Sequence, residues 1–311
     1  MPDTTYAMSE SDAFEWQVVD MIKETPSTHT FVFSTGKKFD CAVGQFVTVG
    51  THLTRPGPNG LEDSWVERAY SIASSPTRNL VELTIKIEKP FGFVNPALKK
   101  ADGFAAYFIE QIKIGDKVKI RPEKKKDHFL SKIASGVEKN IAYWSGENGA
   151  ESARSLIQLM EDKPELGIRL MLFYSNPHLY VNETDRTINI IYYNWLVEKA
   201  KKMENLSVVF ALTRDSEIPS SDNPRVAFKK GRFFVGPEGE PEKTLTKYHG
   251  STDGVFNPIC GSSGFINGMV QGPDGSLQRR KGITQYLMEI ESIRPEKIDR
   301  EQFYLDHAHT S

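Results

Sequence analysis

The feature that most constrains the fold of this chain is a change of hydrophobic pattern near Lys139. Before that point, short β-rich runs alternate with turn-forming residues, which predicts an antiparallel barrel or sandwich. After it, short apolar strands alternate with segments of helical spacing, which predicts a doubly wound parallel sheet. A chain of 311 residues is long enough to bury two such cores. We therefore predict two domains, residues 1–135 and 136–311, with the boundary near Ser135–Gly136.

The runs of residues also predict the individual elements. In the first domain the expected strands are 15–22, 29–35, 44–50, 68–74, 80–88 and 113–122, and the Gly- and Pro-rich segment 51–65 is expected to be a loop. In the second domain the expected strands are 140–145, 168–175, 206–213 and 256–260, and the expected helices are 152–162, 191–203 and 282–293. Residues 215–252 form a polar stretch that is predicted to be a surface excursion.

Composition and charge exclude several classes of protein. A formal net charge of −2 argues against a nucleic-acid-binding protein, which needs a basic surface to neutralise phosphates. Two cysteines, Cys41 and Cys260, exclude a disulfide framework and a four-thiolate iron-sulfur cluster within the chain. No apolar run is long enough to cross a bilayer, and no secretory pattern opens the sequence, so we expect a cytoplasmic protein. His307 and His309 have no further ligands beside them in the sequence, so no metal site is expected.

The most informative run is Arg68-Ala69-Tyr70-Ser71, which follows Gly44-Gln45-Phe46 after one loop. The period of two in a strand puts Arg68 and Tyr70 on the same face. There a guanidinium can grip a phosphate while the phenol ring lies along a flat cofactor. Ser71, at the end of the strand, offers a hydroxyl and an N–H group to a ring heteroatom. The alternative interpretation is an ordinary strand with an exposed arginine.

This arrangement resembles the ferredoxin:NADP reductase superfamily, in the bacterial form of its plant-type fold, over about Trp16 to Tyr304. The resemblance implies a six-stranded antiparallel β-barrel that binds FAD, followed by a Rossmann-like α/β domain with a five-stranded parallel sheet that binds NADP(H) or NAD(H). It also implies that Arg68 binds the FAD pyrophosphate, Tyr70 packs on the isoalloxazine or ribityl group, and Ser71 hydrogen-bonds near flavin N5. Ala69 belongs to the same cofactor-binding strand. Tyr304 aligns with the aromatic residue that stacks on the flavin in relatives.

A second segment that resembles the family is Gly103-Phe104-Ala105-Ala106. It corresponds to the family's Gly-x-x-Ser turn, in which backbone N–H groups hold the pyrophosphate. Ala106 stands where the family has serine. An alanine keeps the backbone donor at the start of a helical turn but loses one side-chain hydrogen bond. The resemblance therefore implies a lower FAD affinity, though not its loss.

In the second domain, the loop Ser145-Gly146-Glu147-Asn148-Gly149 joins a strand to a helix. Glycines let the phosphates of a dinucleotide approach the backbone near a positive helix terminus, so Gly146, Asn148 and Gly149 are candidate binding residues. Glycine-containing turns are also common at strand–helix junctions without any ligand. Glu147 replaces the family's second glycine and Ser152 its proline, so like-charge repulsion weakens dinucleotide binding unless Glu147 points outward.

Three further positions resemble nicotinamide dinucleotide contacts of the family. Cys260-Gly261 follows a strand where the family's cysteine borders the nicotinamide, although a lone cysteine commonly fills a core gap. Thr213-Arg214 matches the Ser-Arg pair that binds the 2′-phosphate of NADP, which favours NADP over NAD. Asn176 stands where the family often has a second arginine, and Arg232 is a candidate replacement. Exposed arginines at strand ends also occur without a ligand.

The resemblance implies hydride transfer between nicotinamide C4 and flavin N5 in the cleft between the domains, with one-electron exchange to a ferredoxin or flavodoxin. Tyr70, Ser71 and Cys260 are then the candidate catalytic residues. The basic clusters Lys124–Lys126 and Arg279–Lys281 are either docking sites for that acidic carrier or solvated faces. Two alternatives stay open. One is an NADH-dependent reductase component for another acceptor, and the other is a flavin-binding regulatory subunit with a degenerate dinucleotide site.

Overall fold

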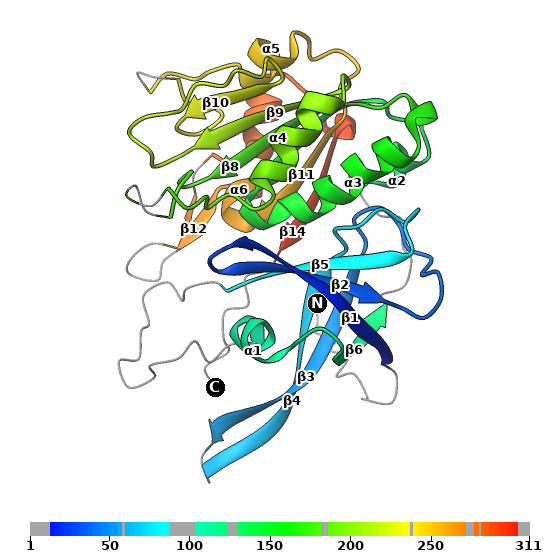
Figure 1. Ribbon diagram of the computed structural model, residues 1–311. Helices are drawn as coiled ribbons and strands as arrows, with labels where there is room; N and C mark the ends of the chain where they lie inside the picture. The colour runs from blue at the N-terminus through cyan, green and yellow to red at the C-terminus, as the bar shows by residue number, and fades with distance from the viewer. Residues whose placement is uncertain are drawn as a thin grey trace. The chain divides into compact units, whose positions relative to one another are not determined.

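The computed structural model describes residues 13–57, 60–87, 104–122, 130–181, 184, 186–236, 239–271, 277–279 and 281–303. The chain divides into two compact units, Met1–Lys126 and Asp127–Ser311. Each unit has its own sheet and its own hydrophobic core (Figure 1). The short helix α2 (Ser131–Ala134) belongs to the second unit in this division, and the boundary expected from the sequence follows it.

The first unit is built on a six-stranded antiparallel sheet in the order β4-β3-β6-β1-β2-β5. The strands are β1 (Phe14–Thr25), β2 (Thr28–Ser34), β3 (Phe46–Gly57), β4 (Gly60–Ser71), β5 (Leu80–Lys86) and β6 (Lys117–Pro122). The two edge strands meet at one isolated bridge, between Ile72 just after β4 and Leu83 on β5. The prediction of six antiparallel strands is confirmed, and within the described ranges this bridge joins the edges of the sheet.

Alternation along these strands creates the core of the first unit. In β1, Trp16 and Val18 are buried while Glu15 and Gln17 are exposed, as expected for a strand with one face in a core. Helix α1 (Phe104–Gln111) adds two buried rings to this core, Phe104 and Phe108. The Phe108 ring meets the Phe31 ring of β2 edge to face at 4.9 Å between centroids.

The prediction of a loop over residues 51–65 is wrong. Strands β3 and β4 pair through this segment up to Gly57 opposite Gly60, and the hairpin extends beyond the other strands of the unit (Figure 1). Trp65 lies across Gly50, so that a β-carbon on Gly50 would be 2.1 Å from the indole ring. The His52 ring packs edge to face on Trp65 at 5.2 Å. These cross-strand contacts override the turn preference of the local Gly and Pro residues.

The second unit contains a parallel sheet in the order β10-β9-β8-β7-β11-β14. Its strands are β7 (Asn140–Gly146), β8 (Arg169–Asn176), β9 (Leu206–Leu212), β10 (Val226–Lys230), β11 (Asn257–Ser262) and β14 (Ile298–Phe303). The α/β class is confirmed, but the sheet has six strands across the described residues instead of five. The sequence patterns revealed the four inner strands and missed both edge strands, β10 and β14, whose polar residues hide the pattern.

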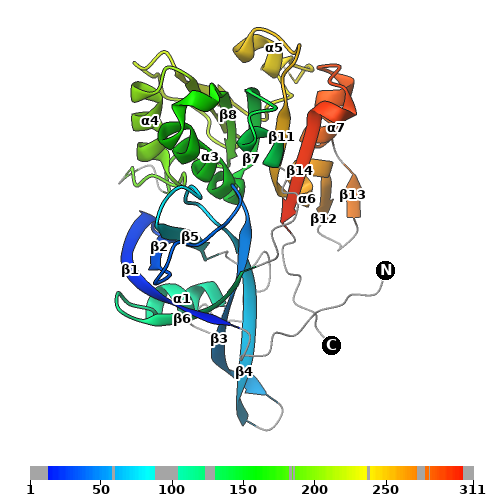
Figure 2. The same ribbon diagram turned by 90° about the vertical axis from the view of Figure 1, so that its right-hand side faces the viewer.

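Helices cover both faces of this parallel sheet, as the doubly wound pattern predicted (Figure 2). The helices of the second unit after α2 are α3 (Ala150–Asp162), α4 (Tyr193–Lys202), α5 (Thr244–His249), α6 (Ser263–Asn267) and α7 (Ile283–Glu289). Helices α3 and α4 lie on one face, and α7 lies on the other. The short helices η2 (Glu147–Gly149), η3 (Pro164–Leu166) and η4 (Pro295–Lys297) and the ribbon of β12 (Met269–Gln271) and β13 (Leu277–Arg279) complete the described elements.

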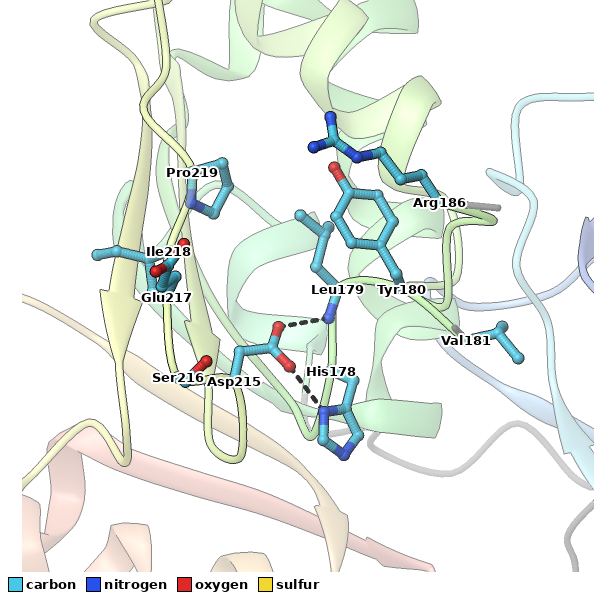
Figure 3. A pocket seen from close by; sticks show the side chains of 10 residues that line it. All are labelled: His178, Leu179, Tyr180, Val181, Arg186, Asp215, Ser216, Glu217, Ile218 and Pro219. Atoms are coloured by element: carbon cyan, nitrogen blue, oxygen red, sulfur yellow. Dashed lines mark hydrogen bonds and ion pairs between the residues drawn. The ribbon is translucent and has the colours of Figure 1, made fainter. Parts of the chain in front are cut away.

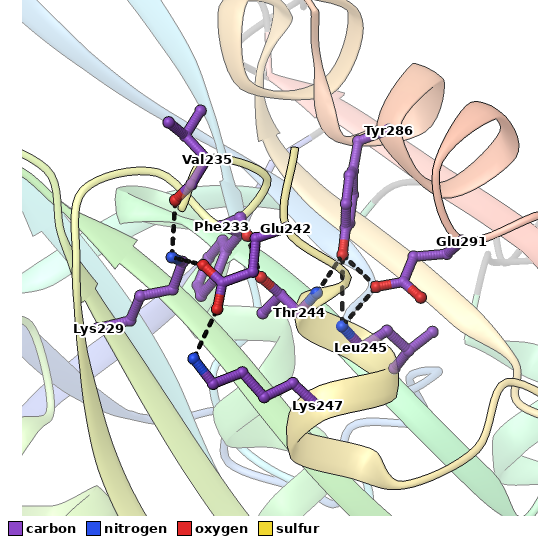
Figure 4. Close-up of polar contacts among 9 residues, drawn as sticks. All are labelled: Lys229, Phe233, Val235, Glu242, Thr244, Leu245, Lys247, Tyr286 and Glu291. Atoms are coloured by element: carbon purple, nitrogen blue, oxygen red, sulfur yellow. Dashed lines mark hydrogen bonds and ion pairs between the residues drawn. The ribbon is translucent and has the colours of Figure 1, made fainter. Parts of the chain in front are cut away.

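The polar stretch 215–252 is more ordered than the sequence suggested. It contains β10 and α5, and two polar networks hold α5 in place (Figure 4). Glu242 bonds to Lys229 and, at 2.7 Å, to Lys247. In the second network, the Tyr286 hydroxyl accepts the Thr244 N–H at 2.8 Å and donates to Glu291. The prediction of a surface excursion is therefore wrong for its last part.

No helix in the described part of the chain is long and apolar enough to cross a membrane.

Candidate functional site

Strand β4 carries the four residues that the sequence singles out in the first unit. Arg68 lies opposite Val49 and Tyr70 opposite Val47, so their side chains share one face of the strand. Both are half-buried, whereas Ala69 between them is exposed. One guanidinium nitrogen of Arg68 donates to the backbone carbonyl of Glu67 at 2.7 Å. The strand therefore holds a cation and an aromatic ring side by side, partly open to a ligand.

The start of α1 lies beside this strand. The rings of Tyr70 and Phe104 are 6.0 Å apart between centroids, with their planes inclined by 32°. Phe104 and Ala106 are buried and Ala105 is half-buried, so this turn is fixed to the core. The first N–H groups of a helix have no partners within the helix and carry partial positive charge, which suits a phosphate. Two segments that the sequence analysis assigned to one cofactor are thus in contact.

Ser71, at the end of the same strand, adds a buried polar atom to this group. The residue is 5% exposed, and its hydroxyl oxygen has no hydrogen-bond partner among the residues that the structure describes. The next residue, Ile72, is fixed by a 2.7 Å hydrogen bond from its N–H to the Gln45 carbonyl. A buried hydroxyl without a partner is costly, so a ligand that supplies the partner is favoured here. Together with Arg68 and Tyr70, this orphaned hydroxyl fits a flat cofactor that carries a pyrophosphate.

In the second unit, the predicted dinucleotide contacts lie at one edge of the parallel sheet. Ser145 pairs with Cys260, and Leu212 pairs with both Asn176 and Lys230. The carboxyl ends of β7, β8, β9, β10 and β11 therefore meet at this edge, where open α/β sheets bind ligands. The predicted residues at these strand ends are Gly146, Thr213, Arg214, Arg232, Cys260 and Gly261.

Neighbouring protein atoms occupy the space beside the glycines of the β7–α3 loop. A β-carbon on Gly149 would lie 2.2 Å from the carbonyl oxygen of Cys260, and one on Gly146 would lie 2.7 Å from the ring of Phe265. Gly261, at φ +159°, would meet the same ring at 2.9 Å. Cys260 is fully buried. The glycines therefore permit close packing of the strand ends, which is a structural use that needs no ligand.

Glu147 occupies an unusual backbone conformation in the same loop. Its φ is +35°, in the left-handed region that favours glycine. The side chain is half-buried. Asn148 lies beside it in η2, and its side chain is outside the described part of the structure. Ser152 is buried in α3. A glycine at position 147 would relieve this backbone conformation.

Thr213 and Arg214 lie in the turn after β9, and backbone hydrogen bonds tie that turn to the end of β8. The Thr213 N–H donates to the Asn176 carbonyl at 3.0 Å, and the Arg214 N–H donates to the Pro177 carbonyl at 2.9 Å. The Arg214 and Arg232 side chains are exposed. The Asn176 side chain is directed into the loop, where its Nδ2 donates to the His178 carbonyl at 2.6 Å.

A pocket that the sequence analysis missed opens beside this turn. Its volume is about 670 Å³. Described residues that line it come from the loops after β8 and β9: His178, Leu179, Tyr180, Val181, Arg186, Asp215, Ser216, Glu217, Ile218 and Pro219 (Figure 3). The Asp215 carboxylate joins the two loops, since Oδ1 lies 2.6 Å from His178 Nδ1 and Oδ2 accepts the Leu179 N–H at 2.9 Å. The only feature of the sequence that could have indicated this pocket is a run of polar residues directly after each of two neighbouring strands.

Several predicted positions lie outside the described residues. They are Gly103, Tyr304, the cluster Lys124–Lys126 and Arg280.

No protein-family model and no curated protein matches this sequence. Solved structures do resemble it. The cytochrome b5 reductase domain of Ulva prolifera nitrate reductase is 14% identical, with a TM-score of 0.61, over 94% of this chain and 98% of that one. A ferredoxin NADP+ reductase from Neisseria gonorrhoeae with bound FAD and NADP is 15% identical, with a TM-score of 0.59, over 94% and 99%. The Plasmodium falciparum ferredoxin-NADP+ reductase with 2′P-AMP is 16% identical, with a TM-score of 0.60, over 96% and 98%.

These similarities show that the chain has the two-domain fold of the ferredoxin-NADP+ reductase superfamily, as the sequence resemblance predicted.

Proposed function

We propose that this chain, which has the ferredoxin-NADP+ reductase fold, is an FAD-dependent reductase that passes electrons between a nicotinamide dinucleotide and a separate one-electron carrier. The observation that carries the proposal is the convergence of Arg68, Tyr70 and the partnerless Ser71 hydroxyl with the start of α1 in the first unit. A cation, an aromatic face, an unused polar atom and a helix N-terminus are the groups that a dinucleotide flavin requires.

In this proposal each residue has a separate task. Arg68 and the backbone N–H groups of residues 104–106 hold the FAD pyrophosphate, Tyr70 packs along the ring system or ribityl chain, and Ser71 bonds the ring edge. When bound, FAD supplies the chemistry that couples the transfer of a hydride to the transfer of single electrons. The chain binds and orients the cofactor and excludes water from it. The stacking role of Tyr304 and the contribution of Gly103 stay predictions.

The proposal assigns the nicotinamide dinucleotide to the carboxyl edge of the parallel sheet. Cys260 and Gly261 would border the nicotinamide, and since Cys260 is fully buried it would shape the wall and not act as a nucleophile. Thr213 and Arg214, with Arg232 beside them, favour NADP over NAD because a hydroxyl and planar cations suit a phosphate monoester. Two of the similar structures carry NADP or 2′P-AMP and another is an NAD+ form, so the preference rests on Thr213, Arg214 and Arg232.

We propose a ferredoxin or flavodoxin as the one-electron carrier. Several of the similar structures are named as ferredoxin-NADP+ reductases. The basic clusters Lys124–Lys126 and Arg279–Lys281 would attract an acidic partner and raise its encounter rate at low salt. An NADH-dependent reductase component for another acceptor would use the same flavin chemistry but a different electron carrier.

Anaerobic mixing of the FAD-loaded protein with NADPH or NADH, followed by flavin absorbance, tests the function. We expect the flavin to be reduced, and faster by NADPH than by NADH. Arg214→Ala is expected to narrow this difference through loss of NADPH affinity. Equal wild-type rates with both nucleotides would remove the role proposed for Thr213 and Arg214. FAD-loaded protein that neither nucleotide reduces would refute the reductase proposal.

A second candidate is a flavin-binding regulatory subunit whose dinucleotide site has degenerated. Two observations favour it: Glu147 replaces a glycine at a left-handed position, and Gly146 and Gly149 are packed against Phe265 and Cys260. The same mixing experiment separates the two candidates, because a regulatory subunit retains FAD and is not reduced.

A further inference from the structure

We infer that the outer edge of β4 binds an extended basic segment of a partner protein as an added β-strand. The binding edge lies in the arm, which is the part of the β3–β4 hairpin formed by residues 51–57 and 60–66. The inference goes beyond the proposed function, because it concerns a protein partner and uses none of the side chains assigned to FAD or to the dinucleotide.

The arm has two open edges among the residues that the structure describes. Strand β4 is the outermost strand of its sheet, and β6 pairs with β3 only from Val47 to Gly50. Strands β3 and β4 nevertheless stay paired as far as Gly57 opposite Gly60 (Figure 2). A strand edge with unpaired N–H and C=O groups is a template for a further strand.

The register of the hairpin identifies the backbone groups that point outward from β4. The Ile72 N–H donates to the Gln45 carbonyl at 2.7 Å. Hydrogen-bonded pairs alternate with non-hydrogen-bonded pairs along an antiparallel ladder, and this ladder runs to its tip without a register shift. The N–H and C=O groups of Leu61, Asp63 and Trp65 therefore point away from β3.

The two edges of the arm differ in their capacity to pair. The outward positions of β3 include Pro56, which has no N–H to donate. The run from Leu61 to Trp65 on β4 contains no proline. Beyond this run, the Glu67 carbonyl accepts a hydrogen bond from the Arg68 guanidinium at 2.7 Å. The open edge of β4 is therefore the run Leu61–Trp65.

Side-chain contacts hold the arm in shape without a partner. The Trp65 ring covers Gly50, and its Nε1 donates to Glu67 Oε1 at 2.7 Å. The His52 ring packs on Trp65, and its Nδ1 lies 3.1 Å from Asp63 Oδ2. An added strand thus meets a preformed edge, so binding does not have to order the arm.

The charge of β4 determines the kind of segment that fits. Residues 60–67 contain three acidic residues, Glu62, Asp63 and Glu67, and no lysine or arginine. The Asp63 side chain is 60% exposed, and neither Asp63 nor Glu67 pairs with a lysine or arginine in the described structure. Alternation puts Asp63, Trp65 and Glu67 on one face of the strand. A segment with basic residues opposite the two carboxylates and an apolar residue opposite the indole complements this face.

A second copy of this chain fits the edge less well. Antiparallel pairing of two β4 edges centred on residue 63 or 65 puts Asp63 opposite Asp63 or Glu67 of the other copy. Like charges directly opposite each other destabilise a sheet. The charge pattern therefore favours a basic segment over self-association.

The test is calorimetric titration of FAD-loaded, full-length protein at low salt with a capped synthetic peptide, Thr-Lys-Thr-Val-Thr-Lys-Thr. We expect this peptide to bind. A matched peptide with glutamate in place of both lysines should bind at least roughly tenfold more weakly. A third peptide, with proline in place of the valine, should lose most of its affinity, because it lacks one backbone donor of the added strand.

Variants of the protein test the same edge from the other side. Asp63→Asn combined with Glu67→Gln should weaken binding of the lysine peptide at least roughly tenfold. Leu61→Pro removes an outward N–H without removing a hydrogen bond of the hairpin, and it should also weaken binding. Glu198→Gln is the matched control, since the Glu198 side chain is 61% exposed and lies in the second unit. It should leave the Kd unchanged.

Residue-resolved amide hydrogen exchange distinguishes an added strand from ionic attraction alone. The bound lysine peptide should slow exchange at the N–H groups of Leu61, Asp63 and Trp65, and not at those of His52 and Thr54 on the other edge. No binding, equal binding of the lysine and glutamate peptides, or unchanged exchange at these three N–H groups overturns the inference. A dimer in sedimentation that protects the same N–H groups also overturns it, because a second copy then occupies the edge. None of these outcomes affects the flavin-reduction test of the proposed function.

Discussion

Gly149 faces Cys260 so closely that a β-carbon on Gly149 would lie 2.2 Å from the Cys260 carbonyl oxygen. The first residue closes the loop after β7 and the second lies near the end of β11, so this contact locks two strand ends together. Gly149→Ala is expected to destabilise the second unit by more than about 2 kcal/mol, because backbone atoms must move to admit the methyl group.

Thermal unfolding measures that effect, with Gly167→Ala as the control. Gly167 has a φ of +64° and nothing within 4 Å of an added β-carbon, so the control carries only backbone strain, about 1 kcal/mol. If Gly149→Ala costs no more than Gly167→Ala, the packing role given to Gly149 is wrong.

Arg68→Ala should release FAD. Loss of a phosphate-binding cation costs roughly 2 to 5 kcal/mol, or at least about thirtyfold in Kd. The measurement is the flavin content of purified protein, followed by FAD titration of the apoprotein. Lys119→Ala serves as the control, since Lys119 is a cation in the same sheet that pairs with Glu15 at 3.3 Å. Full FAD occupancy in Arg68→Ala would contradict the cofactor assignment.

Ser71→Ala should change the stability of the apoprotein and of the FAD-loaded protein in opposite directions. In the apoprotein, removal of a buried hydroxyl that lacks a partner among the described residues stabilises the fold by roughly 1 kcal/mol. With FAD bound, the lost hydrogen bond reduces the stabilisation that the cofactor gives. The measurement is the melting temperature of apo and FAD-loaded protein.

Ser145→Ala is the matched control for this experiment, because the Ser145 hydroxyl is also buried without a partner in the described structure but lies in the second unit. Ser145→Ala should raise the melting temperatures of the apoprotein and of the FAD-loaded protein by similar amounts. A Ser71→Ala variant that behaves in the same way would show that FAD does not engage Ser71.

Glu147→Gly should stabilise the protein by about 1 kcal/mol, because glycine adopts the left-handed conformation at φ +35° without strain. If the carboxylate also lines the phosphate path, the variant binds NADPH more tightly, since a like charge is removed. The measurement is the hydride-transfer rate against NADPH concentration. Ser292→Gly, at φ +57°, provides the same backbone relief away from this loop and should leave the rate unchanged. Tighter binding in both variants would exclude the charge effect.

Glu242→Gln should destabilise the second unit at neutral pH by about 1 to 3 kcal/mol, because it leaves the buried Lys229 ammonium without its counter-charge. Burial alone would raise the pKa of Glu242, but hydrogen bonds from Lys229 and Lys247 hold it below the ordinary value of 4.5. The ionised form therefore stabilises the fold above pH 4.5, and this contribution is lost as the pH falls through the lowered pKa.

The difference between wild type and Glu242→Gln should accordingly shrink in acid, as followed by urea unfolding across that range. Glu198→Gln breaks an exposed pair with Lys202 and should cost much less. A constant difference at every pH would show that Glu242 is not ionised in the folded protein.

The sequence alone determined the class of each unit and the edge at which its candidate residues lie. Strand alternation put Arg68 and Tyr70 on one face, and the strand–helix repeats placed Cys260 and Arg214 at the carboxyl edge of a parallel sheet. Both results follow from local periodicity, which reports which side of an element faces a core. The alternatives for Glu147 came from the resemblance, because the family has a glycine where this chain has a carboxylate, and the left-handed backbone at this residue came from the structure.

The tertiary structure decided what depends on residues far apart in the chain. Trp65 lying across Gly50 turns an expected loop into a long hairpin, and the edge strands β10 and β14 form only because a neighbouring strand offers hydrogen-bond partners. Tyr70 meets Phe104, and Asp215 reaches His178, across loops whose lengths give no signal of the contact. Such contacts form only when segments far apart in the sequence come together in the folded chain. Sequence periodicity therefore could not predict the close packing of the β7–α3 loop or the pocket lined by Arg186.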